Sequence, residues 1–347
     1  MHRFGYSEIK GDIPADIMEL VKSVYAFSIR DADRERLYSK EYEMISRAVR
    51  FASVKYSNEI EGIRTTDDRL EQIVMRGGTP KDHPEEELAG YARAVDLVNG
   101  GLGLSRIDGE TLKLLHSEIR AGNDSERGQY KRRDNAILED CPDGSVRLVF
   151  APVSAEDTGY CMEQLFLVLA GADSEGYEPL LLVPCVILDY LCIHPFADGN
   201  GRTSRLLTMI LLYRYGINIC RYVSLDEYIA ATKNAYYQAL AQSSDGWKEN
   251  EFSYFPFIRY FLRTLYECYI DLDTRFAIAD GKKLNKKRRV ETVLSKSLTP
   301  LSKRQIGMMI PDVSAATIDA AVKELLAAGR AEKVGTFRDA RYRIVTK

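Results

Sequence analysis

Several features that mark other protein classes are absent from this sequence. No apolar stretch is long and uncharged enough for a transmembrane helix, and the first residues lack the apolar segment of a signal peptide. The formal net charge of −3 gives no global attraction to nucleic acid or membranes. The six cysteines are scattered singly without Cys-x-x-Cys spacing, which excludes a zinc-ribbon or disulfide framework. We therefore expect a cytoplasmic protein with cysteines in its core.

Reactive side chains are few, and they concentrate between residues 194 and 205. This run reads His-Pro-Phe-Ala-Asp-Gly-Asn-Gly-Arg-Thr-Ser-Arg. It lies between two apolar segments, 180–193 and 206–213, which have the composition of buried core helices. Because charge near a hydrophobic core is costly unless it is paired or binds something, this loop is the candidate active site.

The second half of the loop suits phosphate groups. Gly199, Asn200 and Gly201 stand where an apolar helix is expected to begin, and the N–H groups and dipole of a helix start favour anions. Arg202 and Arg205 are three residues apart, so both can project from one side of that helix and bind phosphate oxygens. The simpler alternative is a plain turn with two surface arginines.

Two further side chains of the loop supply a metal ligand and a base. Asp198 is a carboxylate suited to Mg²⁺, an ion usually held by one or two carboxylates together with substrate phosphates. His194 is a candidate base near neutral pH. A calcium loop does not fit, because Arg202 occupies a position that needs an oxygen ligand. The loop thus predicts a site that binds a nucleoside di- or triphosphate and deprotonates a nucleophile beside it.

The run resembles the active-site motif of the Fic family, His-Pro-Phe-x-Asp/Glu-Gly-Asn-Gly-Arg-x-x-Arg, and matches every specified position. Most Fic enzymes transfer AMP from ATP to a hydroxyl side chain of a target protein. The resemblance implies that His194 accepts the proton of the target hydroxyl and that Asp198 holds Mg²⁺. It also implies an anion hole along the Gly-Asn-Gly backbone, with Arg202 and Arg205 on the β- and γ-phosphates. The phosphate-transferring relative Doc has lysine where Gly201 stands, which favours AMP transfer here.

A second run, Ser57-Asn58-Glu59-Ile60-Glu61-Gly62, resembles the inhibitory pattern Ser/Thr-x-x-x-Glu-Gly/Asn of self-inhibited Fic proteins. It precedes the catalytic run, which is the class II arrangement. The resemblance implies that Ser57, Glu61 and Gly62 form an inhibitory motif, and that Glu61 pairs bidentately with Arg205 and misaligns ATP. The remaining glutamate of the run is expected to be solvated. In the alternative interpretation, both glutamates are solvated charges at a helix end.

Residues 135–152 have the pattern of a β-hairpin. Fic enzymes carry such a flap over the site, and its edge binds an extended segment of the target protein by strand addition. The alternative is a surface hairpin that only packs. His116 lies among leucines on the helix expected at 108–120, where we favour a hydrogen-bonded core histidine over a second catalytic one.

The helix expected at 226–241 carries Tyr236 and Tyr237, which resemble the paired tyrosines that line the adenine pocket of Fic proteins. At least one of the pair is expected to lie in the core. Ser244 stands where some relatives carry an asparagine that reads adenine, so phosphate binding is better supported than base selectivity.

The predicted fold is mainly α: a Fic-fold helical bundle with a small β-hairpin flap, followed by a winged helix-turn-helix domain. The expected parts are a helical N-terminal region with the inhibitory motif (1–95), the Fic catalytic core (96–280) and the winged-helix domain (281–347). A basic run at 282–289 marks the last boundary. In the C-terminal domain we expect helices at 302–309 and 315–328 and two short strands.

The leading hypothesis is a self-inhibited protein adenylyltransferase that uses ATP and Mg²⁺ and modifies a hydroxyl-bearing protein and itself. The second hypothesis is a DNA-binding regulator whose Fic core senses nucleotide. DNA binding is disfavoured, because the helix at 315–328 offers few base-reading side chains. The side chains able to meet phosphates there are Lys303, Arg304, Arg338, Arg341 and Arg343. A third hypothesis is that Glu61 also orients a water that removes AMP. The sequence leaves a homodimer open.

Overall fold

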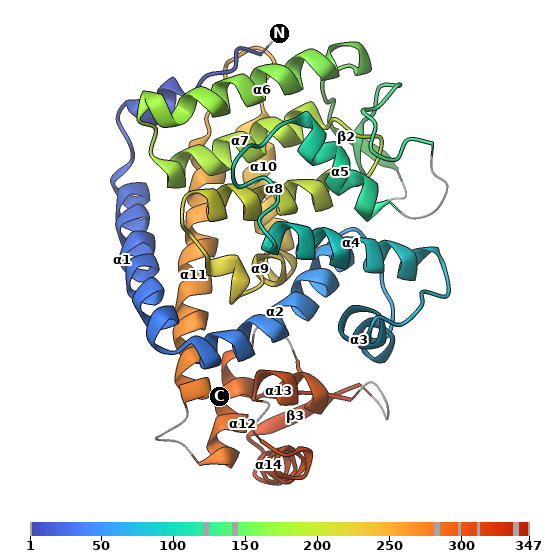
Figure 1. The fold of residues 1–347 in the computed structure, drawn as a ribbon, viewed down its shortest axis with the longest axis vertical. Helices are drawn as coiled ribbons and strands as arrows, with labels where there is room; N and C mark the ends of the chain where they lie inside the picture. Colours follow the sequence, from blue (N-terminus) through green and yellow to red (C-terminus); the bar gives the residue numbers. More distant parts are fainter. Residues whose placement is uncertain are drawn as a thin grey trace.

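The computed structural model describes residues 2–120, 125–140, 145–280, 285–297, 300–310, 313–335 and 340–345. These residues form mostly helices, with two short antiparallel strand pairs. Figure 1 shows the long helices stacked as a bundle, with α12 to α14 and β3 gathered at one end. The mainly α fold with a small hairpin is therefore confirmed. Within the described ranges, no helix combines the length and apolarity needed to cross a membrane.

The N-terminal part is helical, and its α2 carries the candidate inhibitory motif at its C-terminal end. Tyr38, with φ −128°, separates α1 from α2. Thr66 caps α3 by accepting a hydrogen bond from the Arg69 amide, and Gly77 ends that helix in a left-handed conformation. The elements are η1 (Ser7–Lys10), α1 (Ala15–Leu37), α2 (Ser39–Ile60), α3 (Asp67–Arg76) and α4 (His83–Asn99).

The central bundle places the catalytic run between two buried helices, α7 and α8. Helix α7 is apolar on nearly all sides, and accordingly almost every one of its residues is buried. The helices of the bundle are α5 (Gly109–Ile119), α6 (Ala155–Glu175), α7 (Pro179–Ile193), α8 (Asn200–Arg214), η2 (Ile219–Arg221), α9 (Leu225–Ala231), α10 (Lys233–Ser244) and α11 (Phe255–Asp280). The described cysteines are buried and free, as expected.

The single helix expected at 226–241 is wrong, because the chain breaks between α9 and α10 at Thr232. This residue leaves the helical conformation (φ −116°, ψ 31°), and its hydroxyl donates to the Tyr228 carbonyl at 2.7 Å. Such local side-chain to backbone bonds compete with helix continuation. The break turns α10 so that Tyr236 and Tyr237 face the candidate site.

The hairpin expected at 135–152 is present as β1 (Ile137–Asp140) and β2 (Val146–Phe150), with an irregularity between Ile137 and Leu138. A second antiparallel pair near the C-terminus consists of β3 (Ala331–Val334) and β4 (Arg341–Ile344). Residues 141–144 of the expected hairpin, residues 282–284 of the basic run and Arg338 lie outside the described residues.

The C-terminal elements bury a hydrophobic cluster of their own. Val290, Val293, Ile306, Val322 and Tyr342 belong to this cluster, which is separate from the main core. The described part of the basic run does not form a linker, because Asn285 caps a helix that begins directly after it. The helices are α12 (Lys286–Lys296), α13 (Lys303–Met309) and α14 (Ala315–Ala327).

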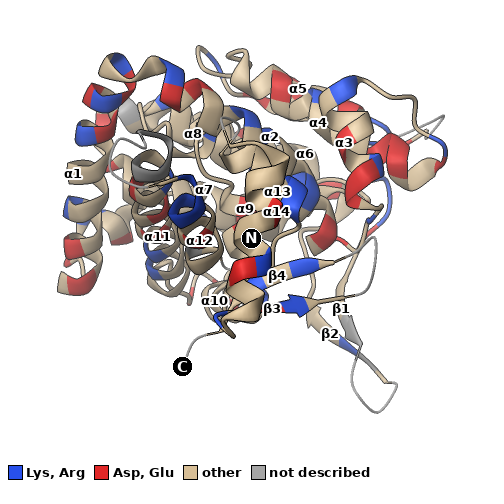
Figure 2. Cartoon of the chain, turned by 90° about the horizontal axis from the view of Figure 1, so that it is seen from below, with Lys and Arg blue, Asp and Glu red and all other residues tan. Residues whose placement is uncertain are grey.

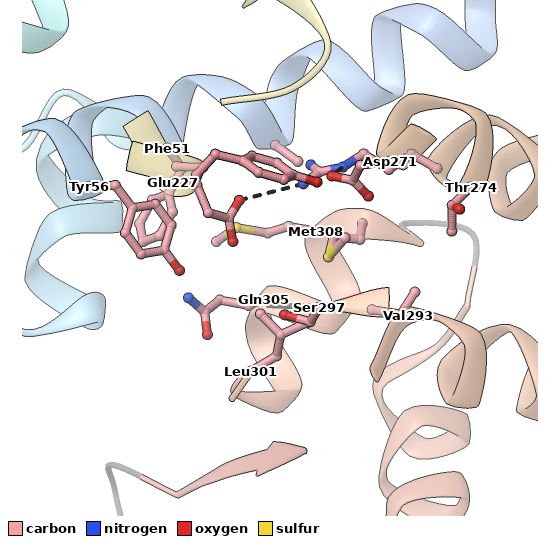
Figure 3. Close-up of a pocket in the computed structure, with 15 residues that line it drawn as sticks. Phe51, Tyr56, Glu227, Asp271, Thr274, Val293, Ser297, Leu301, Gln305 and Met308 are labelled. Atoms are coloured by element: carbon pink, nitrogen blue, oxygen red, sulfur yellow. Dashed lines mark hydrogen bonds and ion pairs between the residues drawn. The ribbon is translucent and has the colours of Figure 1, made fainter. Parts of the chain in front are cut away.

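The C-terminal elements meet the bundle at a junction beside α2 (Figure 3). Phe51 and Tyr56 of α2 lie on one side, and Leu301, Gln305 and their neighbours lie on the other. The cavity between them is about 50 Å³, which has room for a few water molecules but not for an organic ligand. The helix that carries the candidate inhibitory motif is thus also the docking surface for the C-terminal elements.

Candidate functional site

His194 ends α7 in a left-handed backbone conformation, with φ 52° and ψ 61°. This conformation costs about 1 kcal/mol or more for a residue with a side chain, so other contacts must hold it. The imidazole Nδ1 lies 3.2 Å from the Leu191 carbonyl, which can only accept. The proton therefore sits on Nδ1, and Nε2 keeps its lone pair. Burial lowers the pKa of His194 to about 4, so the ring is neutral at physiological pH.

The start of α8 forms the next part of the site. Gly199, with φ 80°, precedes the helix. The Asn200 side chain is hydrogen-bonded to the loop. Its Oδ1 accepts from the Phe196 amide at 2.9 Å, and its Nδ2 donates to the Phe196 carbonyl at 2.7 Å. It braces the loop around the helix start.

Asp198 projects outward, with 66% of its side chain exposed. The Gly199 amide donates to its Oδ1 at 2.6 Å, and Arg120 of the α5 end forms an ion pair with its Oδ2. The motif at 194–205 does not predict a role for Arg120, which lies 78 residues before Asp198 in the chain. The carboxylate therefore faces solvent and a cation at the mouth of the site.

Arg205 is buried and bound by the end of α2. Its Nη2 donates to Glu61 Oε1 at 2.8 Å and to the Ser57 carbonyl at 2.8 Å, and its Nε donates to Ser57 Oγ at 2.7 Å. The contact with Glu61 uses one nitrogen and one oxygen, not the bidentate pair that we expected. Asp226 lies 3.3 Å from Nε. Although burial disfavours the charge, Glu61 and Asp226 raise the pKa of the Arg205 guanidinium.

The end of α2 is held in place from several sides. Gly62, with φ 81°, turns the chain directly after Glu61, which explains the glycine of this pattern. Lys233 of α10 donates to the Ile60 carbonyl at 2.9 Å. Glu59 is half-buried, 4.0 Å from Lys55, and so it is not the solvated neighbour that we expected.

These elements enclose a cavity of about 340 Å³. Tyr236 is buried in its wall, whereas Tyr237 is 45% exposed, and their rings meet edge to face at 5.3 Å. Ser244 also lines the wall. The other lining residues come from the flap, α7, the loop, α8 and the end of α2, among them Ile137, Phe150, His194, Asp198, Gly199, Asn200, Gly201, Arg205 and Glu61.

Comparison with known proteins finds sequence similarity to one family. A sequence model of the Fic/DOC family matches residues 106–212, which span α5 to most of α8. The chain is 27% identical over 212 residues to protein adenylyltransferase fic-1 of Caenorhabditis elegans, covering 57% of this chain and 38% of that protein. It is 26% identical over 248 residues to protein adenylyltransferase Fic of Nematostella vectensis, covering 67% and 52%. Residues 106–212 thus form a Fic/DOC family domain.

Solved structures show the same fold. A Fic family protein from Desulfovibrio desulfuricans superimposes with a TM-score of 0.62 at 18% identity, covering 97% of this chain and 98% of that one. A Fic-domain signalling protein from Bacteroides thetaiotaomicron gives a TM-score of 0.60 at 23% identity, covering 78% and 99%. The chain spans about half or less of the length of the two curated relatives named above.

Arg202 lies away from the cavity, although the sequence places it beside Arg205. It is fully buried, and its Nη1 donates to Glu87 Oε2 at 2.8 Å and to Asn58 Oδ1 at 3.4 Å. The described lining of the cavity does not include it. A spacing of three residues puts the two arginines on one side of α8, but the buried Glu87 carboxylate of α4 binds the Arg202 guanidinium and so determines its direction.

His116 is a core histidine. It stacks on Phe196 at 3.9 Å, accepts from the Gly128 amide through Nδ1 at 3.0 Å, and therefore donates through Nε2 to the Asp198 carbonyl, also at 3.0 Å. Burial lowers its pKa to about 4. Its ring braces the catalytic loop from beneath, which agrees with the simpler of the two interpretations.

Proposed function

We propose that this chain is a protein adenylyltransferase, which moves AMP from ATP to a Ser, Thr or Tyr hydroxyl of a target protein and of itself. The observation that carries the proposal is a neutral His194 whose Nε2 lone pair is available at a helix start, in a cavity lined by two tyrosines. His194 takes the hydroxyl proton while the oxygen bonds to the α-phosphorus. The bond from that phosphorus to the bridging oxygen breaks, and pyrophosphate leaves. Both curated relatives carry the name protein adenylyltransferase.

ATP is the proposed nucleotide, and Mg²⁺ is its proposed partner. Asp198 fits this ion, because an exposed carboxylate at the mouth of the cavity can share it with substrate phosphates. The helix start at 199–201 would receive the phosphates, and Arg205 would bind the far end of the chain once it is released. Tyr236 and Tyr237 would flank the base. For Arg202 we propose an indirect part, since its guanidinium is bound to Glu87.

We propose a class II inhibitory role for Ser57, Glu61 and Gly62. The Glu61 carboxylate binds Arg205 and lies against Gly201, in the space that a phosphate chain would need. While it stays there, the γ-phosphate cannot pair with Arg205, and ATP would bind out of line for attack. The same carboxylate could orient a water for AMP removal, but no contact of the described residues favours this second reaction.

The flap is the proposed binding edge for the target. Leu138, Leu148 and Val149 expose large apolar side chains there, while Ile137 and Phe150 line the cavity. An extended segment that pairs with this edge would carry its hydroxyl towards His194.

For residues 281–347 we propose a winged-helix accessory domain that packs on the bundle, after an N-terminal region (1–95) and a catalytic core (96–280). DNA binding is disfavoured by charge pairing: Lys303 pairs with Asp319, Arg341 with Asp67, and Arg343 with Glu332. Figure 2 shows Lys and Arg interspersed with Asp and Glu along the helices.

The test uses the Glu61→Gly protein with Mg²⁺ and ATP that carries label on either the α- or the γ-phosphate. AMP transfer predicts covalent α-label on protein and no γ-label, and His194→Ala in the same background should abolish it. Covalent γ-label would show phosphate transfer, and absence of both labels would refute the proposed enzyme class.

A further inference from the structure

The carbonyls around His194 are held by a short segment that lies 59 or more residues earlier in the chain. Lys131 donates through Nζ to the Ile193 carbonyl at 3.1 Å and through its backbone amide to the Pro195 carbonyl at 2.8 Å. Asn135 donates through Nδ2 to the His194 carbonyl at 3.3 Å and to the Phe196 carbonyl at 3.0 Å. Four consecutive carbonyls, from residue 193 to residue 196, are thus bound from one segment.

The orientation of the Asn135 amide follows from its contact with Lys131. Lys131 Nζ lies 2.7 Å from Asn135 Oδ1, and an ammonium can only donate. The amide oxygen must therefore face the lysine, which leaves the NH₂ group to face the loop. The two side chains act as one unit, because loss of the lysine would remove what holds the amide in this orientation.

The Lys131 side chain carries a charge in an unusually buried position, since only 4% of the residue is exposed. Burial lowers the pKa of Lys131 to about 8, although the nearby Asp134 opposes that shift. A buried ammonium is costly unless polar groups bind it, and here a carbonyl and an amide oxygen do so. An apolar side chain would fill this position at lower cost if packing were its only task.

The same segment leads directly into the flap. Asn135 lies two residues before β1, and Asp134 accepts a hydrogen bond from the Ala155 amide at 2.7 Å, where α6 begins after β2. Both ends of the flap are therefore tied to the segment that holds the loop. A target hydroxyl bound along the flap would meet His194 at a separation that this segment sets.

We propose that Lys131 and Asn135 are positioning residues for His194, which hold the loop at 193–196 in the backbone conformation that aims the imidazole into the cavity. The proposal rests on the proposed AMP transfer with His194 as the base. The left-handed conformation of His194 is unfavourable by itself, and these hydrogen bonds hold the peptide units on both sides of it. The anion hole and Arg205 lie on α8, so nucleotide binding does not depend directly on the pair.

The decisive variant is Asn135→Asp in the Glu61→Gly background. The carboxylate keeps the shape of the amide and still accepts from Lys131, but it cannot donate to the two carbonyls. We expect the transfer rate at saturating ATP to fall roughly tenfold to a hundredfold, as for a base displaced by about 1 Å. ATP affinity from calorimetry should stay within about threefold, because the helix start is intact. Lys131→Met should have a similar effect.

Lys248→Met is the matched control. Lys248 is a half-buried lysine whose Nζ donates to the Pro152 carbonyl at 3.0 Å, so its loss removes a bond of the same kind outside the loop. This variant should transfer AMP at the rate of the Glu61→Gly parent. The proposal would be overturned if Asn135→Asp transferred AMP at a rate within twofold of the parent. It would also be overturned if all the variants, Lys248→Met included, lost transfer activity equally and in step with a fall in their melting temperatures.

A second readout does not need turnover. In the parent, ¹⁵N shifts of the His194 ring should show the Nδ1–H tautomer, fixed by the Leu191 carbonyl. In Asn135→Asp we expect a mixture of tautomers, because the ring no longer has a fixed backbone beneath it. An unchanged tautomer would overturn the positioning role of Lys131 and Asn135, even if the protein did not transfer AMP at all. Failure of the positioning role can therefore be told apart from failure of the proposed AMP transfer.

Discussion

The Glu61 carboxylate lies against Gly201, close enough that a Cβ on this glycine would stand 2.2 Å from Glu61 Oε1. Glycine at this position leaves room for the carboxylate, and the same space would admit the phosphate chain of the proposed nucleotide. Pairing with Arg205 at 2.8 Å holds the carboxylate in that space. The inhibition that we propose would be direct competition between the Glu61 carboxylate and the phosphate chain for this space and for the Arg205 guanidinium.

Replacing Glu61 with glycine should raise self-labelling with ATP by roughly tenfold or more, because a charge-assisted bond on Arg205 is lost and the space over Gly201 opens. Glu59→Gly is the matched control, since this carboxylate lies two residues away and its ion-pair contact is with Lys55. The measurement is the rate of covalent α-label incorporation. Equal rates for wild type and Glu61→Gly would remove the inhibitory role.

Replacing His194 with alanine should abolish transfer but leave ATP binding nearly intact. A base acts in the chemical step and contributes roughly 10²–10⁴-fold, whereas phosphate binding depends on the start of α8. Labelling and calorimetric ATP affinity should be compared in the Glu61→Gly background. Substantial transfer without His194 would mean that another group accepts the proton.

The pH dependence of transfer should reflect a histidine with a lowered pKa. Burial brings the pKa of His194 to about 4, below the usual value near 6.5, so the neutral form persists as the pH falls through 6 and 5. The active base is lost only as the pH approaches 4. We expect kcat/KM of Glu61→Gly to be flat on the acid side between pH 7 and 5. A decline centred near 6.5 would contradict this.

Asp67 links α2 to the C-terminal elements, and its loss should destabilise the fold. It accepts from buried Lys55 of α2 at 2.8 Å and from Arg341 of β4 at 2.8 Å. Asp67→Ala would leave a buried ammonium poorly paired and should cost roughly 2–3 kcal/mol of unfolding free energy. Asp68→Ala, whose carboxylate is 71% exposed, should cost about 0.5 kcal/mol or less. Urea unfolding compares them, and equal losses would deny the link.

Ending the chain after residue 280 should preserve nucleotide chemistry and change the choice of target. The C-terminal elements have their own hydrophobic cluster, and the cavity contains none of their residues. The truncated bundle should nevertheless melt at a lower temperature, because Phe51 and Tyr56 would lose part of their cover. Full-length and truncated Glu61→Gly proteins should be scored for self-labelling and for labelled lysate proteins. A soluble truncated protein without self-labelling would show that the tail supports catalysis.

The sequence by itself determined the class of fold and the catalytic loop. Local chemistry suffices there, since an apolar run predicts a buried helix, and glycines beside an asparagine predict where the next helix begins. The Glu61 motif and the hairpin at 135–152 were also predictable, because each is contained in a few consecutive residues. The break at Thr232 was not, since nothing in the helical pattern of 226–241 opposes continuation.

Only the tertiary structure decided which partners those residues meet. Arg202 turns to Glu87, Arg205 meets Asp226 as well as Glu61, and Asp198 pairs with Arg120. Each contact joins elements brought together by packing of the helices, and for the buried Arg202 and Arg205 burial makes pairing of the charge obligatory. No sequence motif identified Lys131 and Asn135 either. Their partners are backbone carbonyls, which every residue carries, so no particular residue type marks the contact. The physical reason is the same throughout: sequence patterns encode faces and caps, whereas the partner of a buried polar group is set by whichever element folds against it.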